Sequence, residues 1–367
     1  MTRTTAPSPV ELSDPEPVPT EAPDEPVAPP QMPKKPKFTY NAAGAYIADG
    51  GYDEDIAYFK EYQDRKTGFK QLDRYLTLYP GLAVLGGASS LGKTTFAVNL
   101  IDRLLAKGET VLYFSLEQLQ IELITKSVAR IVKEQNPHTI ITNQDVKRGA
   151  NTPDVMAARA QYTRLAEKLF YIPGDFHMTA QDIAATVEAF RKEYGDVKPV
   201  VVVDYLQIVA PPYGFRGGIR EATDENLKAL KDMQKRNGLF VLIISSFNRS
   251  SNLSPVSYES FKETSMIEFT CDYVWGLQLA ILDAENSDFY SSTGPRQGRR
   301  ATTDEERYAM INAAQQQTPK KVEFVSLKNR NGRQVWKSFF DYYPASDLFV
   351  EEARYTPQIT NSTYTPI

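Results

Sequence analysis

The stretch from Val84 to Thr95, VLGGASSLGKTT, constrains the fold of this chain more than any other. It matches the phosphate-loop pattern G-x-x-x-x-G-K-[ST], in which glycines let successive backbone N–H groups point at phosphate oxygens. The apolar run GLAVLGG before it predicts a buried strand, and apolar residues at helical spacing follow it as far as Gly108. Strand, glycine loop and helix N-terminus are the setting that a nucleotide-binding loop requires, whereas an ordinary Gly/Ser-rich turn needs none of them.

The loop predicts a site for ATP and Mg²⁺. Lys93 is expected to reach the terminal phosphates, and the Thr94 hydroxyl is expected to ligate Mg²⁺. The predicted nucleotide-binding residues are Gly87, Ala88, Ser89, Ser90, Leu91, Gly92, Lys93, Thr94 and Thr95.

The rest of the chain predicts an α/β fold. Near-continuous Val, Ile and Leu runs alternate with helical patterns, which indicates a mostly parallel sheet with helices on both faces. A helix is expected to open at Thr179, with Asp182 three residues on. The expected strands are 110–116, 169–172, 199–209, 238–245, 272–279 and 321–327, and the expected helices are 117–133, 154–168 and 179–194.

Composition divides the chain into parts. Residues 1–37 hold eleven of the 24 prolines, which predicts a disordered tail that either tethers a partner or is simply solvated. A linker helix region is expected over 38–66 and the folded domain over 67–350. Within that domain, 283–320 is polar and predicts an insertion with one short helix, and 351–367 is expected to form a C-terminal tail.

Several classes of function are disfavoured. The single cysteine, Cys271, excludes an internal disulfide framework, and the two histidines, His138 and His177, lie far apart. The sequence shows neither a membrane-spanning run nor a signal peptide, so we expect a cytoplasmic protein without a membrane partner. A net charge of −4 argues against coating nucleic acid through bulk positive charge, but a local basic strip stays open.

Two carboxylates stand at the ends of predicted strands. Asp204 follows four valines, in a strand that we expect beside the phosphate-loop strand, where an aspartate could hold Mg²⁺ or merely cap a helix. Glu117 ends another apolar strand, where it could polarise an attacking water or be the first-turn acid of the next helix.

The order of these motifs resembles the C-terminal ATPase domain of DnaB-type replicative helicases, a RecA-fold family. The resemblance implies a RecA-like P-loop NTPase over 67–350, that is, a helicase ATPase domain. Its motifs are TGFKQLD at Thr67, the glycine loop, FSLEQ, VVVDYLQ, LKALKDM at Leu227, IISSFNR at Ile243, KETSMIEFTCDYV at Lys262, VSLKNRNG at Val325 and FDYYPASDLF.

The resemblance also implies roles for particular residues. Glu117 looks like the catalytic glutamate and Asp204 like the metal aspartate. Lys328 and Arg330 match a Lys-x-Arg pair that reaches the ATP site of the neighbouring subunit, which implies a homo-oligomeric ring, a hexamer. Read without the family, KNRNGR is a basic turn of the kind that faces solvent.

The chain also departs from the family. Ser246 stands where the family has a glutamine that links the γ-phosphate to DNA-binding loops, and serine is too short for that reach. Ala88 and Ser89 replace the family's Arg-Pro. Because no N-terminal helical domain or primase domain is found, we expect a phage, plasmid or mobile-element form.

Single-stranded DNA is the expected ligand of the loops after the Asp204 strand and the SSFNR strand. Glycines, aromatics and arginines suit loops that grip phosphates and stack bases, although an ordinary surface loop would look similar. The candidate DNA-binding residues are Arg216, Arg220, Arg249 and Lys262.

The sequence therefore favours an ATP-dependent DNA helicase or translocase that works as a ring in DNA replication. One alternative is a RecA-fold ATPase that assembles on DNA without unwinding it. Another is a nucleotide-dependent module that meets a helicase or another replication partner through the proline-rich tail.

Overall fold

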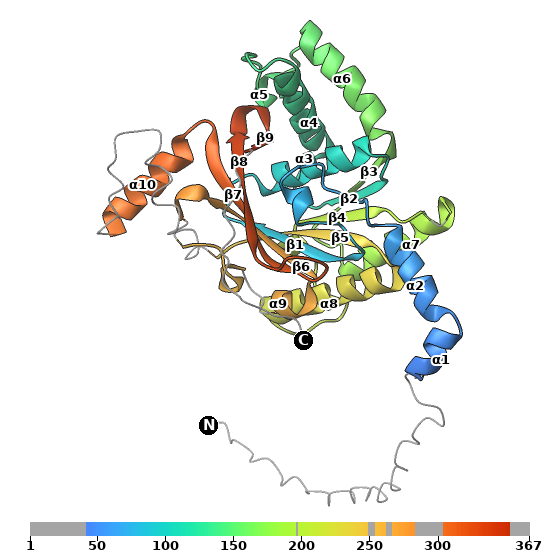
Figure 1. The fold of residues 1–367 in the computed structure, drawn as a ribbon. Coiled ribbons are helices and arrows are strands. Elements are labelled where there is room, and N and C mark those ends of the chain that lie inside the picture. The colour runs from blue at the N-terminus through green and yellow to red at the C-terminus, as the bar shows by residue number, and fades with distance from the viewer. Residues whose placement is uncertain (1–41, 196, 249–253, 262–265, 283–303, 353–367) are drawn as a thin grey trace, which may run out of the picture. The chain divides into compact units, whose positions relative to one another are not determined.

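A single nine-stranded sheet forms the centre of the fold (Figure 1). A computed structural model of the chain describes residues 42–195, 197–248, 254–261, 266–282 and 304–352. The chain divides into two compact units after Glu54, and the second unit contains the whole sheet. The predicted disordered tail, 1–37, lies outside the described residues.

The strand order is β3-β2-β4-β5-β1-β6-β7-β8-β9, and the six strands from β3 to β6 in that order run parallel. The last three strands pair antiparallel. The strands are β1 (Gly81–Gly87), β2 (Val111–Ser115), β3 (Leu169–Pro173), β4 (Val200–Asp204), β5 (Phe240–Ser246), β6 (Tyr273–Leu279), β7 (Lys320–Asn329), β8 (Trp336–Tyr343) and β9 (Leu348–Glu351). The predicted mostly parallel α/β sheet is confirmed.

Three expectations were wrong. The expected strand 199–209 ends at Asp204, because Leu206–Ile208 forms a 3-10 helix. β4, which carries Asp204, does not lie beside β1, because β5 separates the two strands. The predicted tail 351–367 begins too early by one residue, since Glu351 still pairs with Phe340 of β8. Its carboxylate also accepts the Gln71 and Leu72 N–H groups at 2.8 and 2.9 Å, which fixes the strand end to the start of the domain.

Helices cover both faces of the sheet. The helices of the described residues are α1 (Ala43–Ala48), which lies in the first compact unit, α2 (Gly51–Lys60), α3 (Lys93–Ala106), α4 (Gln120–Gln135), α5 (Asn143–Lys147), α6 (Pro153–Leu165), α7 (Ala180–Glu193), α8 (Ile219–Asn237), α9 (Met266–Thr270) and α10 (Asp304–Gln316). The predicted start of α7 is confirmed: the Thr179 hydroxyl accepts the Asp182 N–H at 3.2 Å, and the Asp182 carboxylate accepts the Thr179 N–H at 2.9 Å. Of the predicted insertion 283–320, the described part holds α10, and 283–303 lies outside it.

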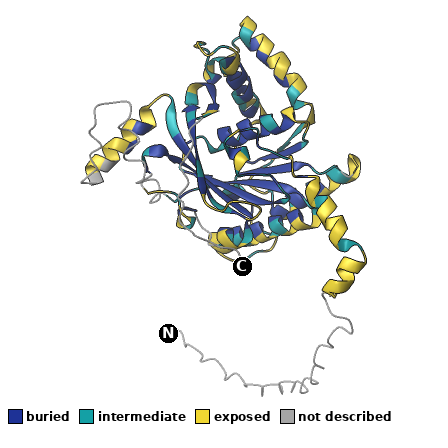
Figure 2. Ribbon diagram, viewed as in Figure 1, coloured by how far each residue is buried: buried dark blue, intermediate teal, exposed yellow. Residues whose placement is uncertain are grey.

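The alternation of side chains along each strand separates two apolar cores. Ala83 and Leu85 of β1 pack on the face that α3 covers, together with Phe96. Leu82 and Val84 pack on the opposite face, which α7 and α8 cover. Figure 2 shows the buried strands between these layers, with the outer sides of α6 and α10 exposed. Because both faces of the parallel strands are buried, their carboxyl ends are held rigidly, and the phosphate loop leaves the sheet at that edge.

Candidate active site

The predicted phosphate loop joins β1 to α3. Gly92 precedes the first residue of α3 and has a φ of 89°, a conformation that glycine adopts without strain. A Cβ atom there would lie 2.9 Å from the ring of Tyr342, so the loop also needs glycine for close packing. The Lys93 Nζ donates to the Ala88 carbonyl at 3.1 Å and so folds over the loop.

The two predicted carboxylates lie near this lysine. Asp204 ends β4 opposite Ser115 of β2, and Glu117 follows β2 by two residues. Burial lowers the pKa of Lys93, and the charges of Asp204 and Glu117 act against that shift. The structure thus brings the phosphate-loop lysine and both carboxylates together at the carboxyl ends of the parallel strands, which we call the carboxyl edge of the sheet.

Asp204 is almost fully buried, whereas Glu117 is exposed. Burial raises the pKa of Asp204, although the Tyr113 and Thr94 hydroxyls and Lys93 lower it. Its Oδ1 has no hydrogen-bond partner in the described part of the chain. Because α4 begins at Gln120 with Leu119 as its N-cap, Glu117 lies before the first helical turn and is not the first-turn acid of that helix.

The two threonines of the loop differ. Thr94 lies close enough to Asp204 to affect its pKa, as a shared metal site requires. The Thr95 hydroxyl instead donates to Asp347 at 2.9 Å, which leaves only its backbone N–H for a phosphate.

Asp347 was not predicted from the sequence as a site residue. Its buried carboxylate also accepts Lys126 Nζ at 3.0 Å and Asn143 Nδ2 at 2.6 Å. These bonds connect the turn between β8 and β9 to α3, α4 and α5, and they fix the phosphate-loop helix against α4. No local sequence pattern predicts this role of Asp347, because its hydrogen-bond partners lie more than 200 residues away in the chain.

The predicted basic pair lies at the opposite ends of the parallel strands, near the starts of β1 and β6. Arg330 follows β7, and its Nη1 pairs with Asp272 Oδ1 at 2.8 Å while its N–H donates to the Asp272 carbonyl at 3.0 Å. Asp272 also accepts the Leu82 N–H at 2.8 Å and pairs with Lys231. The neighbouring Lys328 donates to the Glu268 carbonyl at 2.5 Å.

This anchoring separates Arg330 from the phosphate loop of its own chain. Leu82 is the second residue of β1 and Gly87 is its last, five residues later, which corresponds to about 16 Å of extended strand. The side chain of Arg330 is 69% exposed, so it remains accessible from outside the subunit.

The model of the DnaB-like helicase C-terminal domain matches residues 65–339. The chain belongs to this family. The replicative DNA helicase DnaB of Pasteurella multocida is 27% identical over 230 residues, which are 60% of this chain and 48% of that protein. Its counterpart from Haemophilus influenzae is 26% identical over 219 residues, 57% and 44% of the two chains. This chain therefore spans about half the length of the curated relatives it matches.

Two solved structures share the fold. One of them, an ATPase domain, has a TM-score of 0.62 at 17% identity, with 84% of this chain and 99% of that chain covered. A DnaB-like replicative helicase described with its interactions with primase has a TM-score of 0.63 at 16% identity, with coverage of 85% and 67%. The predicted RecA-like fold is confirmed.

Ser246, at the position where the resemblance implies a glutamine, ends β5. Its N–H donates to Gln207 Oε1 at 3.3 Å, and Gln207 Nε2 donates to the Ser245 hydroxyl at 3.0 Å. Gln207 belongs to the DYLQ motif, yet no pattern in the sequence assigns it a role. It ties the turn after Asp204 to the end of β5.

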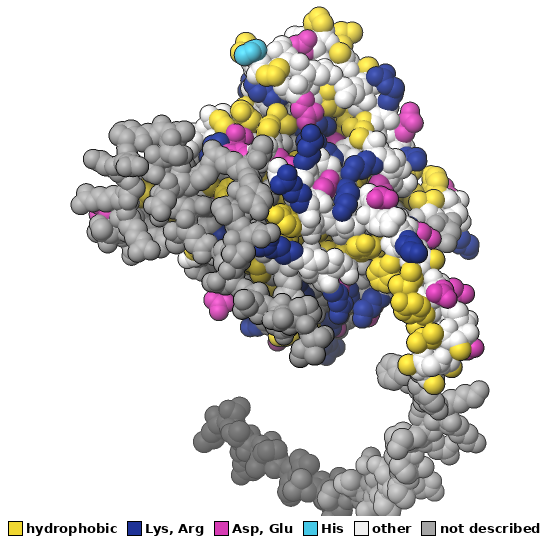
Figure 3. Space-filling model, in the orientation of Figure 1, with side chains coloured by type: hydrophobic (Ala, Val, Ile, Leu, Met, Phe, Trp, Pro, Cys, Tyr) yellow, Lys and Arg dark blue, Asp and Glu magenta, His cyan; other side chains and the backbone are white. Residues whose placement is uncertain are grey.

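The candidate DNA-binding residues are only partly described. Arg216 lies in the loop after β4, and Arg220 lies exposed in the first turn of α8. Arg249 and Lys262 lie outside the described residues. On the face drawn in Figure 3, Lys and Arg side chains are interleaved with Asp and Glu.

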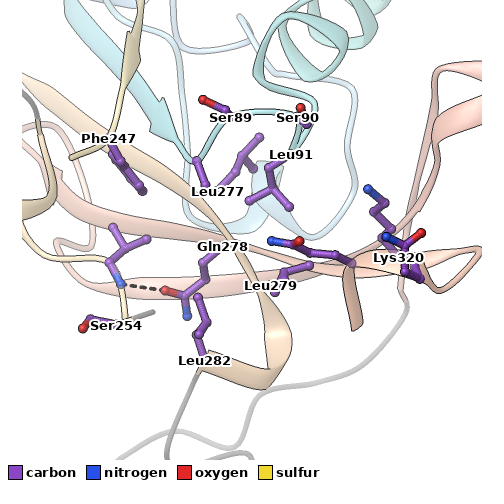
Figure 4. A pocket seen from close by; sticks show the side chains of 14 residues that line it. Ser89, Ser90, Leu91, Phe247, Ser254, Leu277, Gln278, Leu279, Leu282 and Lys320 are labelled. Atoms are coloured by element: carbon purple, nitrogen blue, oxygen red, sulfur yellow. Dashed lines mark hydrogen bonds between the residues drawn. The ribbon is translucent and has the colours of Figure 1, made fainter. Parts of the chain in front are cut away.

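A cavity of about 320 Å³ lies on the other side of the phosphate loop (Figure 4). Ser89 and Leu91 border it on one side, and Gln278 crosses its floor to accept the Val256 N–H at 2.7 Å. Four residues of the predicted nucleotide-binding loop, Ala88 to Leu91, line this cavity, whereas Lys93, Asp204 and Glu117 do not. In the described part of the chain, no helix is long and apolar enough to cross a membrane.

Proposed function

We propose that this chain is the ATP-hydrolysing motor of a DNA helicase or translocase, acting as a homo-oligomeric ring on single-stranded DNA during DNA replication in the cytoplasm. One observation carries the proposal: Lys93, Glu117 and Asp204 meet at one edge of the sheet, while Arg330 is anchored at the other. Family membership and the names of the relatives point the same way.

ATP is the nucleotide that the loop would hold. Its phosphates would bind to the backbone N–H groups from Gly87 to Thr95 and to the Lys93 ammonium. Glu117, exposed beside them, is the group that would orient an attacking water.

The residues at this edge also fit Mg²⁺. Hydroxyl and carboxylate oxygens are the ligands that Mg²⁺ takes, and the buried Asp204 Oδ1 has no other partner in the described part of the chain. Thr94 and Asp204 would hold the ion, which when bound neutralises charge on the phosphates. A buried carboxylate with an unpaired oxygen is costly without such a cation, and that cost supports the assignment.

The position of Arg330 supports a ring. A guanidinium about 16 Å along β1 from its own loop cannot contact phosphates there, but it is exposed and can enter a neighbour's site. An arginine supplied in this way stabilises charge on the transferred phosphoryl group. Each subunit would then offer its nucleotide site to one neighbour and supply Arg330 to the other. Such a head-to-tail interface closes into a ring, here a hexamer. Lys328 would accompany Arg330.

DNA would be gripped by loops rather than by a uniformly basic surface. Positive and negative side chains alternate over the face in Figure 3, so bulk attraction is weak there. Arg216 and Arg220, with Arg249 and Lys262 of the following loop, are the proposed phosphate contacts. The proline-rich segment 1–37 is proposed to bind a replication partner.

One observation favours a second candidate, a RecA-fold ATPase that assembles on DNA without unwinding it. Ser246 lacks the amide that would sense the γ-phosphate, and its backbone is already bonded to Gln207. Hydrolysis and DNA movement would then be less tightly coupled.

The test is ATP turnover with and without single-stranded DNA. The wild-type chain is expected to hydrolyse ATP faster with DNA, and Glu117→Gln should bind ATP but turn it over slowly. Glu122→Gln is the matched control, because Glu122 of α4 pairs with Lys147 of α5 at 3.1 Å and is not assigned to the site. Absence of ATP turnover in the wild-type chain would support the nucleotide-dependent interaction module instead.

A further inference from the structure

A buried tyrosine lies directly beneath the carboxylate of Asp204. The Tyr113 hydroxyl, from the middle of β2, donates to Asp204 Oδ2 at 2.7 Å. The exposed fractions of the two residues are 1% and 2%, so water does not compete for this bond. Tyr113 pairs with Val202 in the parallel register and Ser115 pairs with Asp204, so Tyr113 and Asp204 lie on the same face of adjacent strands.

The two oxygens of the carboxylate are therefore not equivalent. Oδ2 accepts the tyrosine hydroxyl, whereas Oδ1 is buried without a hydrogen-bond partner among the described residues. Lys93 and Thr94 are the first residues of α3, directly after the phosphate loop. The hydrogen bond from β2 thus determines which oxygen is left for a cation.

We propose that Tyr113 is a positioning residue for the metal site: its hydroxyl fixes the Asp204 carboxylate so that Oδ1 is presented to the Mg²⁺ of the bound nucleotide. The inference rests on the proposed function of this edge as a Mg²⁺–nucleotide site. Partners that hydrogen-bond to a metal ligand orient it, and their loss typically weakens metal binding by about 10–100-fold.

Tyr113→Phe removes only the hydroxyl oxygen and leaves the ring in the core between β2 and α3. If Tyr113 merely satisfies a buried oxygen, this variant loses stability and nothing else. If Tyr113 positions Asp204, the variant needs about tenfold more Mg²⁺ for the Mg²⁺-dependent part of nucleotide binding.

Tyr171→Phe is the matched control. The ring centroids of Tyr171 on β3 and Tyr113 are 5.6 Å apart. The Tyr171 hydroxyl, however, hydrogen-bonds with the Tyr162 hydroxyl at 3.4 Å. Both variants thus remove one tyrosine hydroxyl from neighbouring strands, and only one of them touches Asp204.

The experiment titrates Mg²⁺ into the full chain with a fluorescent ADP analogue and repeats the binding in EDTA. We expect equal affinity in EDTA for all variants and a raised half-saturating Mg²⁺ concentration for Tyr113→Phe alone. An unchanged Mg²⁺ requirement in Tyr113→Phe overturns the inference while the nucleotide site stands. Failure of the wild-type chain to bind the analogue contradicts the proposed function itself.

Thermal unfolding covers the case in which Tyr113→Phe folds poorly. The variant would leave Asp204 Oδ2 buried and unpaired, so adding Asp204→Asn should restore part of the lost melting temperature. A double variant no more stable than Tyr113→Phe would show that the hydrogen bond does not hold Asp204.

Discussion

Replacing Arg330 with alanine should leave the fold nearly intact. The side chain is 69% exposed, and exposed ion pairs contribute about 0–1 kcal/mol. Asp272 keeps its bonds to Lys231 and the Leu82 N–H, so no buried charge is left unpaired. For a domain of this size, a loss of about 1 kcal/mol lowers the melting temperature by roughly 2–4 °C.

The same substitution should have a much larger effect on hydrolysis. An arginine that reaches a neighbouring site contributes about 10³–10⁵ in rate, and the lower value corresponds to about 4 kcal/mol in the activation free energy. Arg330→Ala is therefore expected to bind ATP normally, melt within a few degrees of the wild-type chain and hydrolyse ATP about 10³-fold more slowly. Arg333→Ala is the control, since this arginine of the same turn stacks over Tyr75 at 5.4 Å.

The assay mixes Arg330→Ala subunits with Glu117→Gln subunits, each inactive alone. In a head-to-tail ring assembled at random, roughly a quarter of the interfaces would pair an intact Glu117 with an intact Arg330. Partial recovery of ATP turnover is expected once labelled subunits show exchange. If the mixture stays inactive after verified exchange, or if Arg330→Ala alone is fully active, the ring mechanism is wrong.

Other substitutions test the loop and its support. Lys93→Ala should abolish most ATP binding or turnover, and unchanged ATPase kinetics would remove the phosphate-loop assignment. Gly92→Ala should lower the free energy of unfolding by about 1–3 kcal/mol and weaken nucleotide binding. Gly108→Ala is the control, because Gly108 has a φ of 87° but an added Cβ would meet no atom within 4 Å, so only the backbone strain remains. Equal nucleotide affinity in both variants would argue against close packing at the loop. Asp347→Ala leaves the partly buried Lys126 without its ion-pair partner and should lower the free energy of unfolding by about 3–5 kcal/mol in denaturant titrations. A loss below about 1 kcal/mol would show that the network is not stabilising.

Local patterns were sufficient for the parallel core. Each expected strand from 110–116 to 272–279 combines a short apolar run with flanking turns and corresponds to a strand of the parallel sheet, although the run 199–209 is a strand only as far as Asp204. The start of α7 at Thr179 follows from a capping pattern only three residues long. The loop from Gly87 to Gly92 is recognisable from its local pattern, and Gly92 has a φ of 89°, which favours glycine.

Features that depend on long-range packing could not be predicted in this way. β8 and β9 pair antiparallel at the sheet edge, and their aromatic residues pack on α3 only once the chain has folded back. β4 was placed beside β1 because strand content does not reveal order, and β5 enters between them. From the sequence, Tyr113 is indistinguishable from an ordinary core residue, because its hydrogen-bond partner Asp204 lies 91 residues further along the chain.

Unwinding of a forked duplex tests whether this chain converts ATP hydrolysis into movement along DNA. The wild-type chain is expected to displace the strand only with ATP and Mg²⁺, and Lys93→Ala should displace none. DNA-stimulated ATP turnover without strand displacement would contradict the helicase assignment and favour a RecA-fold ATPase that assembles on DNA, with Ser246 as the first residue to change to glutamine.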